Sequence, residues 1–287
     1  MNKINLFKTN NPISALKICS LFVLLIAAGR SEAQNGFDIG LRTVIQKSSL
    51  INKQDQATGH ELDYKLNWHV AFGLGADYTF SKHFGAGIDL LFSKQGEGYK
   101  GTTITGADPS TLYNEFQGLA AANSIPFSGA YTADITISTM KIPFMLRYTG
   151  NSTKKYYFSS FIGPQIDMIS KVVVKVNGTE AKFTSLGIKP EDVYKKTTMD
   201  AVLGLGAGMN LNKNLVLTAG LRLDYGLGDV EKKDATFSNG TQKFYPVSRT
   251  STTNNATGGL WISLNYKFVK KAPEKPAVKG KQVPKKK

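Results

Sequence analysis

The sequence has almost no cysteine and no long hydrophobic run in its interior, and each absence excludes a class of protein. Cys19 is the only cysteine among 287 residues, and it lies in an N-terminal apolar segment of the kind removed during export. The remaining chain then has no thiol for a disulfide, a thiolate metal site or a cysteine nucleophile. No interior stretch reaches the roughly 18 apolar residues that a transmembrane helix needs.

Histidine is also scarce, and nothing in the sequence singles out a catalytic site. His60, His69 and His83 do not have the spacing of a metal site. No nucleophile stands out beside a matching base. The repeat Gly204-x-Gly206-x-Gly208 lies within a predicted strand, whereas a dinucleotide-binding loop needs a strand, a turn and a helix. We therefore expect no metal, no cofactor and no catalytic residue, and hence a protein that is not an enzyme.

The positive charge is concentrated at the two ends of the chain. Residues 1–33 contribute +3 and residues 269–287 contribute +7 to the net charge of +15, which leaves +5 for residues 34–268. The central body therefore has no basic groove, and we expect no nucleic-acid partner. Residues 269–287 are rich in Lys and Pro and are predicted to form a disordered periplasmic tail. This tail is either simply solvated or attracted to cell-wall polymer and lipid head groups.

The N-terminus has the features of a secretory signal peptide. Three lysines precede the 11-residue apolar core Ile18–Ala28, which is too short to span a bilayer of roughly 30 Å. Ser31-Glu32-Ala33 then provides a small-x-small cleavage pattern. We predict that residues 1–33 are a signal peptide and that residues 34–268 form the folded body.

Between Gly36 and Phe268 the dominant pattern is an alternation of apolar and polar residues, which is typical of β-strands with two unlike faces. In one segment Trp68 and Phe72 alternate with His69 and Gly73. We count eight such segments, at 36–47, about 66–80, 84–95, about 134–149, about 156–174, about 198–211, 215–227 and 258–268.

The connections between these segments are alternately short and long. Residues 81–83, 150–155 and 212–214 make short turns, and the long connections are 48–65, 96–133, 175–197 and 228–257. Short periplasmic turns and long extracellular loops are the pattern of outer-membrane barrels. An even number of strands places both ends of the body on the periplasmic side.

Alternation alone does not decide which face points into the barrel. A lipocalin-like ligand binder would turn its apolar face inward. Three features favour the opposite arrangement: a polar face rich in small residues, an apolar face almost without charge, and aromatic residues near the short turns, as in an interfacial girdle. The predicted girdle is Tyr78, Phe80, Phe84, Tyr148, Tyr156, Tyr266 and Phe268. We therefore predict an all-β fold, a single eight-stranded antiparallel up-and-down transmembrane β-barrel in the bacterial outer membrane.

Several stretches resemble a known family. LNWHVAFGLGADYTF, MKIPFMLRY, FIGPQ, AVLGLGAGMNL, LTAGLRLDYGLGD and LWISLNYKF, with the pair Ile142-Pro143, are similar to the eight-stranded outer-membrane protein β-barrel domain family, often called the porin family, and more loosely to small OmpX/OmpA-type barrels. The resemblance covers residues 34–268. It implies insertion by the barrel-assembly machinery and contact with outer-membrane lipid and lipopolysaccharide, but no shared activity. Barrels of this kind commonly end on an aromatic residue, whereas here 19 residues follow Phe268.

Acidic and basic residues are balanced on the predicted lumen face. The network consists of Asp38, Arg42, Asp77, Asp89, Lys141, Arg147, Asp167, Arg222, Asp224 and Lys267. The interior of an eight-stranded barrel is just wide enough for side chains to fill, and buried charges there must be paired. The network is therefore interpreted first as a structural salt-bridge core and second as a narrow polar path for ions.

Function is then expected to depend on the long loops, where recognition usually occurs. Their aromatic residues either bind ligands or pack the loops against the barrel rim: Tyr99, Tyr113, Phe116, Tyr131, Phe244 and Tyr245. The leading hypothesis is a non-enzymatic outer-membrane protein with a structural or binding role. The alternatives are a narrow passive channel, a lipid-acting membrane enzyme and a lipocalin-like ligand binder.

Overall fold

The computed structural model describes most of the predicted body of the chain. It covers residues 36–52, 62–101, 111–127, 129–182, 190–232, 237–238, 243–244 and 252–268. The predicted signal peptide and the predicted Lys/Pro-rich tail lie outside the described residues. No helix in the described ranges is long and apolar enough to cross a membrane.

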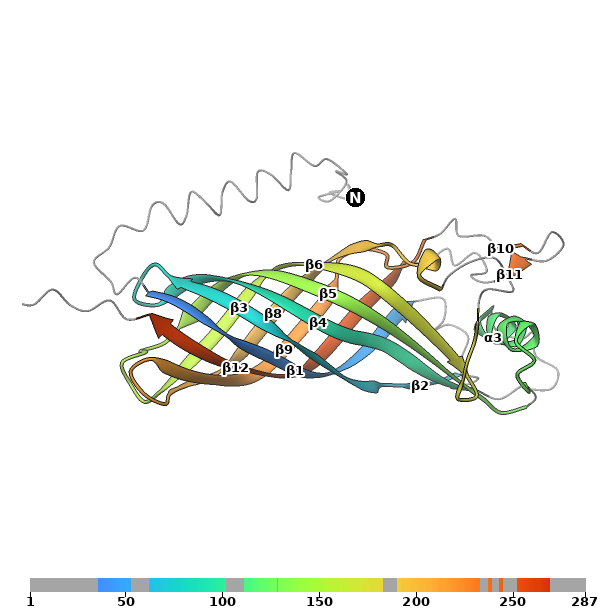
Figure 1. The fold of residues 1–287 in the computed structure, drawn as a ribbon, viewed down its shortest axis with the longest axis horizontal. Coiled ribbons are helices and arrows are strands. Elements are labelled where there is room, and N and C mark those ends of the chain that lie inside the picture. The colour runs from blue at the N-terminus through green and yellow to red at the C-terminus, as the bar shows by residue number, and fades with distance from the viewer. Residues whose placement is uncertain are drawn as a thin grey trace, which may run out of the picture.

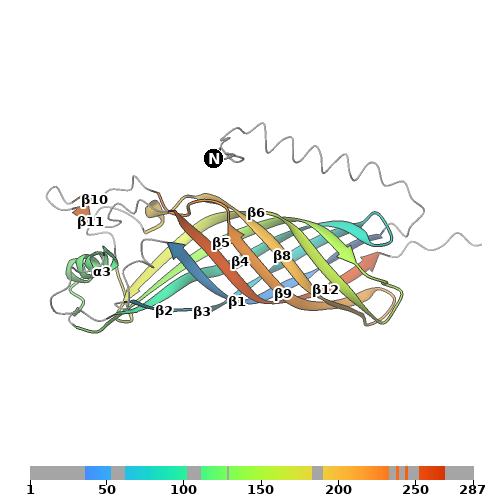
Figure 2. The same ribbon diagram turned by 180° about the vertical axis from the view of Figure 1, so that it is seen from behind.

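Eight long antiparallel strands form a closed barrel (Figures 1 and 2). They are β1 (Gly36–Asn52), β3 (Asn67–Thr79), β4 (Phe84–Gly101), β5 (Tyr131–Thr149), β6 (Tyr156–Val176), β8 (Thr197–Asn210), β9 (Leu215–Gly226) and β12 (Thr253–Phe268). Each strand pairs with the next of the eight along the chain, and the ring closes where β1 pairs with β12. The predicted fold class is confirmed.

The two ends of the barrel carry different connections between the strands (Figure 1). Short connections join β3 to β4, β5 to β6 and β8 to β9 at one end, where β1 also begins and β12 ends. The other end carries the helix α3 (Thr111–Ala122) and the short 3-10 helix η3 (Pro190–Val193). It also carries the short strands β2 (Leu62–Lys65), β7 (Thr179–Glu180), β10 (Phe237–Ser238) and β11 (Lys243–Phe244).

Apolar side chains point outward over about ten residues of each long strand, as predicted. The outward side chains of Trp68, Leu74 and Leu221 are 68%, 63% and 67% exposed. A strand rises about 3.3 Å per residue and is tilted by roughly 40° in such barrels, so ten residues span a band about 25 Å tall. We call this region the apolar band. It matches the hydrocarbon thickness that an outer-membrane barrel has to cover.

Several strands continue past the apolar band, so the long loops are shorter than predicted. β4 extends to Gly101, β5 begins at Tyr131 and β12 begins at Thr253, whereas the sequence predicted ends at 95, 134 and 258. In β5 the inward positions of this upper part are apolar, and Tyr131, Ala133, Ile135 and Ile137 are all buried. In β12 they are polar, and Thr253 and Asn255 are buried. In β5 and β6 the apolar side chains therefore move from the outer face to the inner face, so a search for one continuous alternation does not find the upper parts of these strands.

A β-bulge causes part of this change. The register between β5 and β6 shifts between Ser138 and Thr139, which face Lys171 and Ile169. Ser170 is thus the additional residue. Before it Asp167 points into the lumen, and after it Val172 does. A bulge leaves one residue unpaired and reverses the faces of those that follow, so the end of β6 turns its valines inward.

Candidate functional site

Near its periplasmic end the lumen holds a buried cluster of four charged side chains from four strands. Arg42 contacts Asp77 at 2.7 Å and Asp89 at 3.0 Å. Arg147 contacts Asp77 at 2.7 Å and approaches Asp89 to 3.9 Å. Asn265 also accepts a hydrogen bond from the Arg42 guanidinium. We call these four residues the lower ion cluster. Two guanidinium groups and two carboxylates balance, as burial requires.

A second cluster, the upper ion cluster, lies further along the barrel. The Lys141 ammonium group contacts Asp224 at 2.9 Å and Asp167 at 3.7 Å. The Arg222 guanidinium contacts Asp224 at 2.8 Å and donates to Gln165. Gln165 donates in turn to Asp167 over 2.7 Å. Each buried charge therefore has a charged or hydrogen-bonding partner.

An apolar layer separates the two ion clusters. Phe161 and Trp261 pack edge to face with ring centroids 5.1 Å apart, and the rest of the layer is Val44, Ala71, Met145 and Val202. A void beside this layer, lined also by Arg42 and Asp89 of the lower ion cluster and Arg222 of the upper one, has a volume of about 10 Å³. That is the room a single water molecule needs. At the level of this layer the described lumen is thus filled by packed side chains.

The glycine repeat of β8 makes room for this filling. A Cβ added to Gly204 would lie 2.2 Å from the Phe161 ring, and one added to Gly208 would lie 2.3 Å from the Tyr157 ring. Neither position can hold a larger side chain unless the ring moves. The repeat Gly204-x-Gly206-x-Gly208 therefore belongs to lumen packing, in agreement with its position within a strand.

The structure joins eight of the ten residues of the predicted network in ion pairs: Arg42, Asp77, Asp89, Lys141, Arg147, Asp167, Arg222 and Asp224. Asp38 and Lys267 are register partners on β1 and β12 at the periplasmic mouth, but no ion pair among the described residues includes them. The predicted network omits Asp200, which is fully buried and accepts a hydrogen bond from Asn255 over 3.3 Å. The alternation of β8 already places Asp200 on the lumen face.

The predicted girdle residues lie on or beside the periplasmic ends of the strands. Phe84 and Tyr148 pack edge to face at 5.5 Å, as do Tyr266 and Phe268 at 5.2 Å. Tyr156 begins β6, and Tyr78 and Phe80 lie at the end of β3 and just after it. This arrangement places the aromatic rings at the level expected for a membrane interface.

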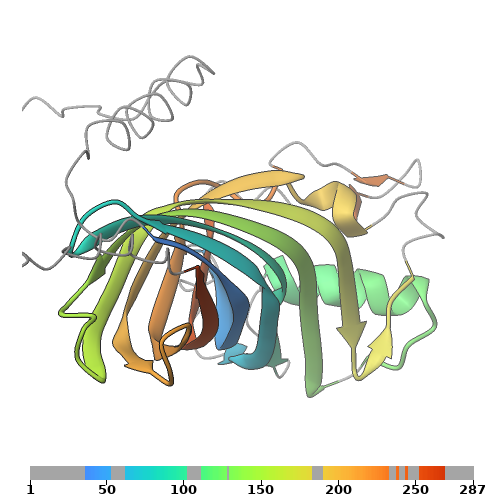
Figure 3. The same ribbon diagram turned by 60° about the vertical axis from the view of Figure 1, so that its left-hand side comes forward.

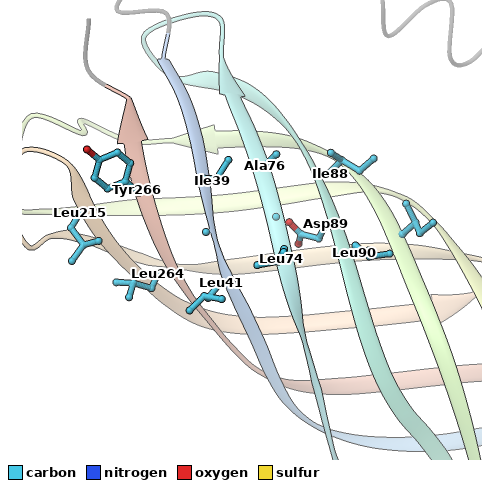
Figure 4. A pocket seen from close by; sticks show the side chains of 13 residues that line it. Ile39, Leu41, Leu74, Ala76, Ile88, Asp89, Leu90, Leu215, Leu264 and Tyr266 are labelled. Atoms are coloured by element: carbon cyan, nitrogen blue, oxygen red, sulfur yellow. The ribbon is translucent and has the colours of Figure 1, made fainter. Parts of the chain in front are cut away.

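A large groove lies on the outer surface of the barrel (Figure 4). It has a volume of about 700 Å³ and is lined mainly by outward apolar side chains, among them Leu41, Leu74 and Leu264. These side chains lie within the apolar band, where lipid tails are the surrounding medium. We therefore assign this groove to lipid contact rather than to a polar ligand.

Above the apolar band, α3 packs against the inner face of the extended strands (Figure 3). Phe116, Leu119 and Ala120 of the helix are fully buried or nearly so. The Phe116 ring lies 5.4 Å from the Tyr99 ring and 6.2 Å from the Tyr131 ring. Of the six aromatic residues predicted in the loops, Tyr99, Phe116 and Tyr131 thus pack the loops against the barrel. Tyr245 and the side chains of Tyr113 and Phe244 lie outside the described part of the structure. We call this assembly the extracellular cap.

Hydrogen bonds connect the cap to a tight hairpin. Asn177 and Gly178 have φ angles of 48° and 78° and form the two-residue turn between β6 and β7. Asn177 accepts a hydrogen bond from the Thr132 amide over 2.9 Å and donates one to the Pro126 carbonyl over 2.8 Å. An Asn-Gly pair is a strong hairpin signal, whereas the alternation pattern predicts only a long connection over residues 175–197.

The second half of the cap comes from η3 and the segment after β9. Val193 and Tyr194 are buried, and Tyr194 bridges Glu231 in antiparallel pairing. The Lys232 side chain donates to the Asp192 carbonyl over 2.9 Å. Within the described residues no group of three or more His, Cys, Asp or Glu could hold a metal ion.

Comparison with solved structures gives small outer-membrane barrels at low sequence identity. Neisserial surface protein A is 13% identical with a TM-score of 0.38, and the match covers 81% of this chain and 97% of that one. OprG from Pseudomonas aeruginosa is 12% identical with a TM-score of 0.37, covering 84% and 99%. Ail, the attachment invasion locus protein of Yersinia pestis, is 12% identical with a TM-score of 0.36, covering 80% and 98%. No curated protein sequence matches the chain.

A family comparison identifies most of the body. The model described as "Outer membrane protein beta-barrel domain" matches residues 31–232, more than two thirds of the chain. The matched segment contains seven of the eight barrel strands, from β1 to β9. The chain belongs to the outer membrane protein β-barrel domain family and is a protein of the bacterial outer membrane.

Proposed function

We propose that the protein is a closed, non-enzymatic barrel whose extracellular cap has a binding or structural role at the cell surface. The observation that supports this proposal is the filling of the lumen. Two ion clusters lie on either side of the Phe161–Trp261 layer, and the void beside that layer is about 10 Å³. Hydrated ions and small solutes need a continuous polar path, and a void of this size has room for about one water molecule.

The cap supports the second half of the proposal. Its buried residues hold α3 and η3 against the barrel, because both share one apolar cluster with β4, β5 and β6. A fixed surface binds with a lower entropic cost than a flexible loop. The barrel then serves as a rigid base, and the exposed residues of the cap make contact with a partner.

Conductance in planar bilayers tests the closed lumen. The refolded protein is expected to insert without discrete currents. The double variant Phe161→Ala/Trp261→Ala removes the apolar layer and is expected to conduct. Phe158→Ala is the matched control, because this residue lies on the same strand with an outward side chain that is 51% exposed, and it should remain silent. Discrete currents through the wild-type protein would contradict the proposal and favour the narrow channel.

A further inference from the structure

Three lysines lie on the outside of the barrel at the extracellular edge of the apolar band. Lys47 faces Trp68 across β1 and β3. Lys94 of β4 and Lys171 of β6 both face Ser138 of β5, one from each side. None of the three lysines forms an ion pair with a carboxylate among the described residues. This side of the barrel therefore presents positive charge at the level of the lipid head groups.

A groove lies beside these lysines on the same outer surface. Its volume is about 570 Å³, within the range of small-ligand sites. Its apolar lining includes Trp68, Val70, Phe72 and Phe92, and its upper edge includes Lys94, Ser138 and Ser170. The Lys47 ammonium group lies 4.7 Å from the centroid of the Trp68 ring. The groove thus combines an apolar floor below with a basic edge above.

The groove lies where the ladder between β3 and β4 is interrupted. β3 pairs with β4 only as far as Ala71 and Ser93, and pairing resumes between Lys65 and Gly98. The intervening stretches hold five residues on one strand and four on the other, so they cannot stay in register. Side chains of β1 occupy the gap instead.

Gln46 donates to the Lys94 carbonyl over 3.1 Å. Ser48 accepts a hydrogen bond from the Gly96 amide over 2.8 Å and donates to the Gly96 carbonyl over 2.6 Å. These bonds satisfy backbone groups of β4 on the side where the pairing with β3 is interrupted. The depression in the wall is therefore built into the fold.

We propose that this groove binds the phosphorylated acyl lipid of the outer leaflet, lipid A, with its phosphates at Lys47, Lys94 and Lys171. Charge complementarity selects this occupant. A lysine is a compact cation that binds phosphate readily, whereas a zwitterionic phospholipid brings no net charge. The acyl chains lie over Val70, Phe72 and Phe92, and Trp68 lies at the boundary between chain and head group, a common place for tryptophan.

The chain provides its own probe for this site. It has two tryptophans, and Trp261→Phe removes the one in the lumen and leaves Trp68. The variant is placed in nanodiscs of brominated phosphatidylcholine, which quench its emission, and lipid A is added. Displacement of the brominated chains by lipid A should raise the emission. Lipid A without its phosphates should need at least about ten times the concentration, since the three charges then have no partner.

Matched charge variants identify the residues. In the same background, Lys47→Gln/Lys94→Gln/Lys171→Gln should weaken binding of phosphorylated lipid A about tenfold or more. The control Lys82→Gln/Lys154→Gln/Lys213→Gln removes the same charge from exposed positions at the periplasmic end and should leave binding unchanged. The proposal is overturned if the control loses as much affinity, or if lipid A binds equally well without phosphates. The comparison of the two lipids needs no lysine variant and does not depend on how the variants fold.

Discussion

β5 passes through two environments and has the opposite pattern in each. Within the apolar band it points Phe144 and Leu146 outward and the charged Lys141 inward. Above the band it points Ile135 and Ile137 inward and the polar Thr136 outward. β5 is one continuous strand through both regions. The medium outside the wall decides which face is apolar, and the other face has to be filled accordingly.

The two interiors are consequently stabilised in different ways. Inside the band, buried charges are tolerated only because each has partners. The loss of one partner leaves the other charges buried and uncompensated. Inside the cap, stability comes from apolar burial and close packing, which respond more gradually to substitution. Substitutions placed on both sides of the boundary can therefore test the comparison.

Removal of Asp224 should have the largest effect. Asp224→Ala leaves Lys141 and Arg222, which it contacts at 2.9 Å and 2.8 Å, without their shared carboxylate. Breaking a buried pair costs about 3–5 kcal/mol, and the free energy of unfolding in urea should fall by that amount. Asp38→Ala is the control, since no described ion pair includes Asp38, and it should cost less than about 1 kcal/mol. If Asp224→Ala lowered the free energy of unfolding as little as Asp38→Ala does, the upper ion cluster would contribute little to stability.

A lysine placed on the outer face of β5 should distinguish the two regions directly. Phe144→Lys puts a charge near the middle of the apolar band, which costs about 2–4 kcal/mol on a lipid-facing barrel surface. Thr136→Lys places the same charge on the same face of the strand above the band, where a surface change stays within about 0.5 kcal/mol. Equilibrium unfolding in lipid vesicles measures both. Similar losses of unfolding free energy in the two variants would mean that the edge of the apolar band does not lie between Thr136 and Phe144.

The hairpin of the cap should respond to a smaller change. Gly178 has a φ of 78°, which costs a residue with a Cβ about 1–2 kcal/mol. Gly178→Ala should therefore speed amide exchange in β7 and the end of β6 and leave β9 unchanged. Gly228→Ala is the control, because an added Cβ meets nothing within 4 Å at either glycine and only Gly178 has a positive φ. A global change in exchange would show that the cap and the barrel unfold together.

The smallest difference should come from two isoleucines on one strand. Ile137 is fully buried in the cap, so Ile137→Val should cost about 1 kcal/mol through the methylene it removes. Ile142 faces lipid, which fills the space left by Ile142→Val, and this change should cost less. Amide exchange in residues 131–137 and unfolding in urea provide the two measurements. A larger loss at Ile142 would contradict the comparison.

The membrane-spanning part of the fold could be predicted because lipid imposes one rule on every strand. Positions such as Trp68 and Leu221 must be apolar, and their neighbours are then free to be small or charged. The sequence cannot say which acid meets which base. Arg42 lies beside Asp77 and Asp89 because of the relative register of three strands. That register depends on the closure of the whole barrel.

The cap was harder to predict because its signals are short and change phase. The helix has Leu112, Phe116 and Leu119 at helical spacing, but a single such stretch within a long connection is a weak indication. The bulge at Ser170 reverses the faces of β6 within one residue. Neither the bulge nor the packing of α3 on the strands can be deduced without the spatial arrangement.

The pairing of the first strand with the last determines how this chain can assemble. Arg42 and its hydrogen-bond partner Asn265 are 223 residues apart, so the contacts that complete the ring are also the most distant in sequence. Closing a loop of this length is entropically costly and slow. A chain that ended at residue 232 would contain everything the family model matches and still expose the unpaired edges of β1 and β9. Such edges promote aggregation, so synthesis of β12 is the step that makes the chain competent to close.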